Sequence, residues 1–294
     1  MEYQEIEMNQ RGQIEYIRRK YGHYLLSHSF CTLILWKETL KLSIHLEEDF
    51  FVVKYETNGE NSYFFPCGND EKKRQFIDSM LGTKDFAMYY MTEEDKQFVE
   101  KYYNGRLQTE YDRGGCEYIF DRAGHVLLKG KTYAKIRYEQ NHLLSSYEVR
   151  SIPMTPEMEG QVLEIIEEWE QEHQLHHAGE DDYEVAKSAL KYFNEMQFIG
   201  NLVYVNDIPY AIAIGGEITE DTFGIQIAKT RSQIGGLMFY LLHKCFELIP
   251  ARYLYINGDD DMNVEGIRIH KKKMKPCRMN EVWKVFWQEA EDGR

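Results

Sequence analysis

The order of secondary-structure signals in the second half of the chain most strongly limits what this sequence can fold into. Residues 148–152 predict a strand, and Thr155-Pro156 then opens a helix whose apolar stripe runs over 158–169. A second helix is predicted over about 183–196. The remaining signals follow in order: strands at about 201–205, 209–217 and 222–228, a helix at 236–248, a strand at 253–256, a basic helix, and a last strand near Arg278.

This succession of strand, helix, helix, three strands, helix, strand, helix and strand is that of the N-acetyltransferase (GNAT) fold. The first half of the chain shows a looser version of the same alternation. We therefore predict an α+β protein with two tandem GNAT-like acyl-CoA N-acyltransferase folds, each a mixed, mostly antiparallel sheet flanked by helices. The predicted domains are residues 1–129 and residues 130–294, and the second includes a linking helix over 131–146.

In the first half, the helix signals are separated by segments rich in β-branched and aromatic residues. The apolar run at 30–36 is predicted to be a strand on this ground, and residues 118–120 are predicted as the strand that completes this half. Thr92 is a predicted cap. The other predicted elements are helices at 13–21, 69–80 and 93–103 and strands at 41–45, 50–55, 63–65 and 86–91.

The net charge of -14 argues against a surface that coats nucleic acid broadly and excludes DNA as an expected partner. One dense basic cluster stands out, because six Lys or Arg residues fall between Arg268 and Arg278. Two interpretations remain open for it: a phosphate-binding surface, or an exposed helix end that interacts favourably with the helix dipole.

Several classes of protein are excluded by composition and motif. No apolar run approaches the length of a membrane span, and the acidic first residues lack the pattern of a secretory signal. Five scattered cysteines without a CxxC pair fit free thiols in the cytoplasm. His173, His176 and His177 lack a second ligand cluster, and the calcium-loop pattern from Asp259 has Val264 where glycine is required, so no metal site is expected.

The stretch from Tyr253 to Arg278 brings an apolar strand, an acidic turn and the basic cluster together. Glu265, Arg268 and Lys271 fall at spacings of three, so they would share one face of a helix that begins near Asn263. Such a strand followed by a charged turn is a common place for a site. A solvated helix with internal ion pairs is the alternative.

The segment that joins the third strand of the second half to its helix is the predicted phosphate turn. Gln233 and Gly236 match the first part of the GNAT pattern Q/R-x-x-G-x-G/A, but Met238 occupies the last position. Small residues there would let backbone N–H groups point at the pyrophosphate of coenzyme A. A plain strand-to-helix turn at Gly235-Gly236 is the alternative.

Several stretches, in order over nearly the whole chain, resemble the phosphatidylglycerol lysyltransferase C-terminal-like family of tandem GNAT-fold acyltransferases. The final block, from Ile256 to Pro276, carries the resemblance most specifically. The sequence departs from the family's pattern at Gly235, where an Arg is expected, and at Ala228, where an acid is usual. The stretches are Ser29-Phe30 with Leu35-Trp36, 65–68, Gly130-Lys131 with Lys135, Arg137 and Asn141, Lys229 and Gly236, and Tyr255-Ile256-Asn257 with Glu265-Gly266, Arg268, Lys271 and Pro276.

The resemblance implies a bacterial, cytoplasmic transferase that moves an acyl or aminoacyl group, with aminoacyl-tRNA as the donor and a small-molecule, lipid or peptide acceptor. Acyl transfer to an amine or hydroxyl needs a base and oxyanion donors. A coenzyme A-dependent N-acetyltransferase and a non-catalytic scaffold are the alternatives. The expected roles are Asp261, Glu265 and Asn257 in catalysis, Gln233, Gly235, Gly236 and Lys229 in binding the donor, and Lys135, Arg137, Arg268 and Lys271 on phosphate.

Overall fold

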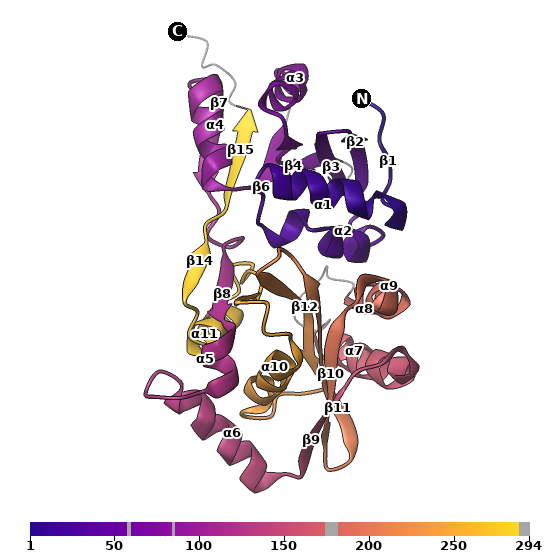
Figure 1. Ribbon diagram of the computed structural model, residues 1–294, viewed down its shortest axis with the longest axis vertical. Helices are drawn as coiled ribbons and strands as arrows, with labels where there is room; N and C mark the ends of the chain where they lie inside the picture. The colour runs from indigo at the N-terminus through magenta and orange to yellow at the C-terminus, as the bar shows by residue number, and fades with distance from the viewer. Residues whose placement is uncertain (58–59, 84–85, 174–181, 288–294) are drawn as a thin grey trace. The chain divides into compact units, whose positions relative to one another are not determined.

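The computed structural model describes residues 1–57, 60–83, 86–173 and 182–287, which divide into two compact units (Figure 1). The first unit comprises Met1–Glu117, Asp260–Asn263 and Asn280–Arg294, and the second comprises Tyr118–Asp259 and Val264–Met279. These units are defined by which residues pack together. The predicted boundary between residues 129 and 130 separates domains that would fold independently, and it stays a prediction.

The first unit contains a mixed sheet with the strand order β1-β2-β3-β4-β6-β15-β7, and β5 pairs with β3 outside this path. Most of its neighbouring strands are antiparallel, but β4 and β6 run parallel. Its elements are β1 (Gln4–Glu5), α1 (Arg11–Lys20), α2 (Phe30–Trp36), β2 (Ser43–Glu47), β3 (Phe50–Thr57), β4 (Glu60–Phe64), β5 (Cys67–Gly68), α3 (Asp70–Met80), β6 (Ala87–Met91), α4 (Glu93–Tyr103), β7 (Leu107–Tyr111) and β15 (Trp283–Trp287).

The second unit contains the other mixed sheet, with the strand order β14-β8-β13-β12-β11-β10-β9. Here β12 and β13 run parallel, whereas β9 to β12 are antiparallel neighbours. Its elements are β8 (Glu117–Asp121), α5 (Arg122–Leu127), α6 (Ala134–Ser146), β9 (Val149–Pro153), α7 (Glu159–His173), α8 (Asp182–Lys191), α9 (Phe193–Met196), β10 (Ile199–Val205), β11 (Ile208–Glu217), β12 (Thr222–Thr230), α10 (Leu237–Leu248), β13 (Tyr255–Asn257), α11 (Glu265–Lys273) and β14 (Arg278–Asn280).

These two sheets confirm the predicted α+β class, with two mixed sheets flanked by helices. The order from β9 to β14 is also the one predicted for the second half of the chain. Alternate side chains of its strands face opposite ways, so Val203, Ala211 and Phe223 join the core with α10. Helix α7 packs against β11 and β12, with Val162 and Ile165 fully buried.

The predicted strand at residues 30–36 is wrong, because this run forms helix α2. The Ser29 hydroxyl accepts a hydrogen bond from the Thr32 amide and caps the helix. The apolar side chains that follow are buried around the helix, among them Phe30, Leu33 and Leu35. In a short run in which nearly every side chain is apolar, the spacing of apolar and polar residues cannot distinguish a strand from a helix.

The strand predicted at 118–120 exists as β8, but it does not complete the first half. It joins the second unit's sheet, where Ile256 of β13 pairs with Phe120. Strand β15, which the sequence did not predict, lies between β6 and β7 of the first unit's sheet and is antiparallel to both. Each sheet therefore contains a strand that the predicted boundary at residue 129 assigns to the other half of the chain. No helix in the described residues is long and apolar enough to cross a membrane.

Candidate functional site

The parallel pair β12 and β13 separates at the end of β13. Their register ends where Gly224 pairs with Asn257, whereas β12 continues to Thr230. A bulge at this point moves the register with β11, so that Gly215 pairs with Ile225 and Ile214 with Ile227. The bulge reverses the face on which later side chains lie.

The reversal directs Lys229 toward α7. Its Nζ lies 3.4 Å from the centre of the Trp169 ring. Arg231, two residues further on, forms ion pairs with Glu164 at 2.9 Å and with Glu168 at 2.5 Å. The structure thus gives Lys229 a cation–π contact on α7. The sequence did not identify Trp169 and Arg231 as functional candidates, since only the unpredicted bulge places them together.

Gly236 is the N-cap residue of helix α10, and no other residue type would easily adopt its backbone conformation. Its φ angle is 85°, and a Cβ atom there would lie 2.3 Å from the carbonyl oxygen of Glu139. Gly235 and Gln233 before it are exposed. No side chain of the described residues caps this helix. The first backbone N–H groups of a helix have no acceptor within the helix, so they can donate hydrogen bonds to an anion.

Three helices of the second unit meet at this first turn of α10. From α6, the Glu139 backbone covers Gly236, and Gln140 Nε2 donates to the carbonyl of Phe239 at 3.0 Å. From α11, the His270 ring packs against the Phe239 ring with centres 4.8 Å apart. We call this arrangement of α6, α10 and α11 the helix junction. It places the basic helix beside the amides that begin α10.

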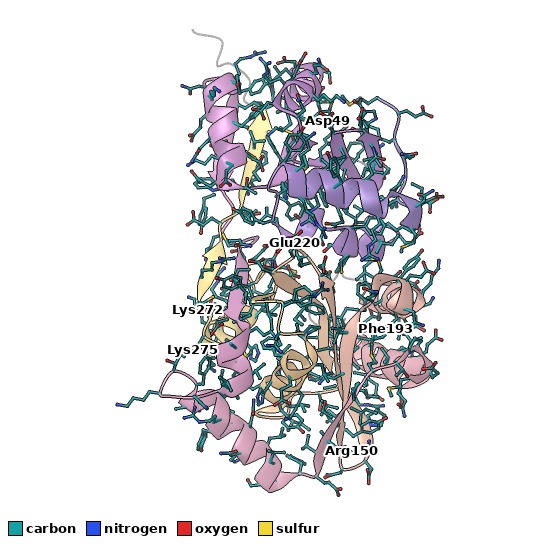
Figure 2. The ribbon with its side chains drawn as sticks, in the orientation of Figure 1. Asp49, Arg150, Phe193, Glu220, Lys272 and Lys275 are labelled. Atoms are coloured by element: carbon teal, nitrogen blue, oxygen red, sulfur yellow. The ribbon has the colours of Figure 1, made fainter. Side chains whose placement is uncertain are left out.

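The basic residues of α11 and the segment after it divide by exposure. Arg268 and Lys271 are half-buried, and Lys271 Nζ lies 5.7 Å from the centre of the Tyr118 ring. Lys272, Lys273 and Lys275 are exposed, with Lys272 and Lys275 labelled in Figure 2. We call the exposed group of Lys272, Lys273, Lys275 and Arg278 the α11 patch.

His270, on the inner side of α11, is an uncharged member of the helix junction. Burial, with smaller contributions from Lys271 and Lys273, lowers its pKa to about 4. The ring is therefore neutral at pH 7. A neutral imidazole allows α11 to pack against Phe239 although the helix carries several cations.

Asn257 ends β13 and is fully buried. Its Oδ1 accepts a hydrogen bond from the Asp259 amide at 2.8 Å, and Gly258 N donates to the Tyr118 carbonyl at 2.9 Å. A Cβ atom on Gly258 would lie 2.4 Å from Phe120 Cε2. The turn after β13 is thus fixed against β8.

Asp261 belongs to the first unit and lies in a closed environment. Its side chain is fully buried and forms an ion pair with Arg113 at 3.1 Å. Its Oδ1 accepts from the Asn263 amide, and its own amide donates to the Gly114 carbonyl. These contacts hold the segment after β7. Glu265, by contrast, belongs to the second unit, begins α11 and is exposed.

The two predicted phosphate-binding residues of α6 have partners within the second unit. Lys135 Nζ forms an ion pair with Glu139 at 2.7 Å, next to the helix junction. Arg137 Nη1 donates to the carbonyl oxygens of Leu128 and Gly130 and so holds the loop before α6. Among the described residues, no group of three or more His, Cys, Asp or Glu could hold a metal ion. His176 and His177 lie outside the described residues.

Comparison with protein families gives a match over nearly the whole chain. Residues 18–286 match the model described as phosphatidylglycerol lysyltransferase, C-terminal. Comparison with curated proteins gave no match.

Three solved structures illustrate the similarity in fold. A conserved protein of unknown function from Bacteroides thetaiotaomicron has a TM-score of 0.88 at 24% identity, over 97% of this chain and 99% of that one. The C-terminal domain of a protein assigned as a lysylphosphatidylglycerol synthetase from Agrobacterium fabrum has a TM-score of 0.68 at 14% identity, over 96% and 92%. L-PGS from Bacillus licheniformis has a TM-score of 0.65 at 13% identity, over 96% and 93%.

Proposed function

The chain belongs to the phosphatidylglycerol lysyltransferase C-terminal family, and from this premise we propose that it is an acyl- or aminoacyltransferase. The proposed donor is an aminoacyl-tRNA, and the proposed acceptor is an amine or hydroxyl group on a lipid or peptide. The family's description names a lysyltransferase that acts on phosphatidylglycerol, which supports this class of donor and acceptor.

The observation that carries the proposal is the helix junction. An aminoacyl-tRNA carries many phosphates, so its binding site needs many cations along the RNA and a few well-placed hydrogen-bond donors near the reacting ester. The α11 patch supplies exposed cations, and the packing of His270 on Phe239 joins α11 to the first turn of α10. We assign Arg268 and Lys271 to phosphate near this turn.

The residues of α6 and β12 take supporting roles in the proposal. Lys135 is paired with Glu139, whose backbone lies against Gly236, and it is proposed to exchange this partner for a phosphate of the donor. Arg137 positions the loop before α6 through its two backbone carbonyl partners. Lys229 stabilises the start of the turn toward Gln233 by its contact with Trp169.

The proposed reaction is attack of the acceptor's amine or hydroxyl on the ester carbonyl of the donor. The new amide or ester bond forms as the bond to the tRNA ribose oxygen breaks, and that oxygen takes up a proton. The amides of Gly235 and Gly236 are proposed to face the donor, and Asn257 is proposed to orient it at the end of β13. Glu265 is the proposed base because it is exposed. Asp261, which the sequence also suggested, is buried and paired with Arg113 within the first unit, so it is included in the test only for comparison.

A transfer assay tests these roles. The chain is incubated with tRNA that carries a labelled amino acid and with phosphatidylglycerol vesicles, and the label in extracted lipid is measured. Glu265→Gln keeps the shape of the side chain and removes the base, so we expect the rate to fall about 100-fold or more. Asp261→Asn is compared with it, together with the unfolding transition of each variant. Full activity in both variants would refute the assignment of the base.

A coenzyme A-dependent N-acetyltransferase is the second candidate function. Gly236, with its positive φ angle at the uncapped start of α10, favours it. Met238 occupies the position where this class has glycine or alanine, which counts against coenzyme A as the donor.

A further inference from the structure

The outer side of α6 and the end of α5 expose large apolar side chains. Leu127 is 58% exposed, Tyr138 is 60% exposed and Leu144 is 47% exposed. The opposite side of α6, with Ile136 and Leu143, is buried in the core around α10. Single exposed apolar residues are common, so the argument depends on what surrounds these three.

The contacts of Arg137 place the loop before α6 on the side of this helix that carries Leu144. Its guanidinium holds the carbonyls of Leu128 and Gly130, so the loop lies along the Arg137 side of α6. Leu144 follows Arg137 by seven residues, which is two helical turns, and it therefore lies on the same side. Tyr138 lies about 100° further round the helix, where it is exposed beside Lys135, whose Nζ lies 4.9 Å from the centre of its ring. In Figure 1, α6 lies outside α10 and is joined to α5 by this loop.

This part of the chain is basic, although the protein is acidic. Residues 122–147 contain five Lys or Arg residues and one acid, a net charge of +4, within a chain whose net charge is -14. The acid, Glu139, is paired with Lys135 at 2.7 Å. Lys129 and Lys131 are exposed in the loop beside Leu127.

We propose that Leu127, Lys129, Lys131, Tyr138 and Leu144 form a docking face for an anionic lipid surface. Exposed Leu and Tyr side chains among lysines are the composition that binds at the boundary between headgroups and acyl chains. Nucleic acid has no comparable use for two exposed leucines. The α11 patch, built of cations alone, is the contrasting surface that suits polynucleotide phosphate. The docking face deepens the proposed function, because a lipid acceptor must be reached from a membrane, but its binding does not require the transfer reaction.

Vesicle flotation with the full chain tests the docking face. Vesicles that contain phosphatidylglycerol are compared with vesicles of phosphatidylcholine alone, at one fixed salt concentration. We expect binding only to the anionic vesicles. Lys129→Glu with Lys131→Glu should weaken it about 30-fold or more, since each lysine near such a surface contributes about fivefold in affinity. Leu127→Ser with Leu144→Ser should also weaken it.

Matched controls distinguish the docking face from general charge. Lys272→Glu with Lys273→Glu changes the net charge by the same amount on α11, and Ile269→Ser removes an apolar side chain that is 44% exposed on the same helix. Both should keep vesicle binding, and circular dichroism checks that each variant is folded. Equal loss from both pairs of lysine substitutions, or no binding to anionic vesicles, would overturn the proposal. Loss of tRNA binding instead of vesicle binding in the Lys129 and Lys131 variant would assign the face to nucleic acid. Transfer to a soluble amine, assayed separately, reports on the proposed function alone.

Discussion

At the scale of single residues, Gly236 has the most constrained position in the candidate site. Its positive φ angle and the Glu139 carbonyl, 2.3 Å from any Cβ atom, both exclude a side chain. The sequence motif identified this glycine for a different reason, namely close approach to phosphate. The structure adds that Gly236 also permits α6 to pack against the start of α10.

Gly236→Ala should lower the free energy of unfolding by about 2 to 4 kcal/mol, because it combines a left-handed backbone with overpacking. Gly235→Ala is the matched control, since nothing lies within 4 Å of a Cβ atom there. It should change the stability by less than about 0.5 kcal/mol. Urea denaturation of both variants checks the prediction, and equal stability of the two would contradict the packing described for α6.

His28 provides a second prediction at this scale. Burial lowers its pKa to about 3, and its two ring nitrogens bond to Ser27 Oγ and the Phe65 carbonyl. In the unfolded chain the His28 imidazole is protonated below about pH 6.5, whereas in the folded chain it is protonated only below about pH 3. Stability is thus fully present above about pH 6.5 and falls as the pH drops, by about 1.4 kcal/mol per pH unit for this proton.

His28→Gln, which cannot be charged, should reduce that pH dependence. The measurement is urea denaturation between about pH 7 and about pH 5, above the range where carboxyl groups dominate. The neighbouring His23 acts in the same direction, since burial lowers its pKa as well. His142→Gln, at an exposed position of α6, serves as the control. An unchanged slope in His28→Gln would mean that His28 is not held neutral by the fold.

At the scale of elements, local patterns predicted most helices but not the pairing of strands. The cap at Thr92 and the linking helix were both found, because each depends on neighbours in sequence. The exchange of β8 and β15 between the two sheets could not be found, since it joins residues more than 130 positions apart. The contact of His270 with Phe239, on which the candidate site depends, joins two separate helices, so no local pattern predicts it.

Strand β15 should be needed for the first unit's core although it lies near the end of the sequence. Val285 is 1% exposed and belongs to the core around β3, β4 and β6. Val285→Ala should cost about 2 kcal/mol and speed hydrogen exchange in β6. Lys284→Ala, next to it in the same strand, loses an ion pair with Glu110 and a cation–π contact with Phe286, and should cost less than about 1 kcal/mol. Equal exchange rates in β6 for both variants would contradict the pairing.

At the scale of the whole molecule, the charge distribution separates the surfaces that the proposals use. The chain carries a net charge of -14, yet the α11 patch and the docking face are both basic. The sequence identified the first of these, since its cations lie within seven residues of one another. It did not identify the docking face, because exposure of Leu127 and Leu144 depends on how α6 packs. The division of roles between lipid and RNA therefore rests on the fold.

The central claim is that an aminoacyl-tRNA is the donor. Its most direct test is thermal unfolding of the chain with aminoacyl-tRNA, with deacylated tRNA and with acetyl-coenzyme A. A ligand at about 100 times its dissociation constant adds about 2.7 kcal/mol to the stability. We predict that aminoacyl-tRNA raises the unfolding temperature more than deacylated tRNA does, and that Lys272→Glu with Lys273→Glu reduces this effect. Stabilisation by acetyl-coenzyme A alone would contradict the claim in favour of an N-acetyltransferase, and no stabilisation by any of the three would leave a scaffold protein.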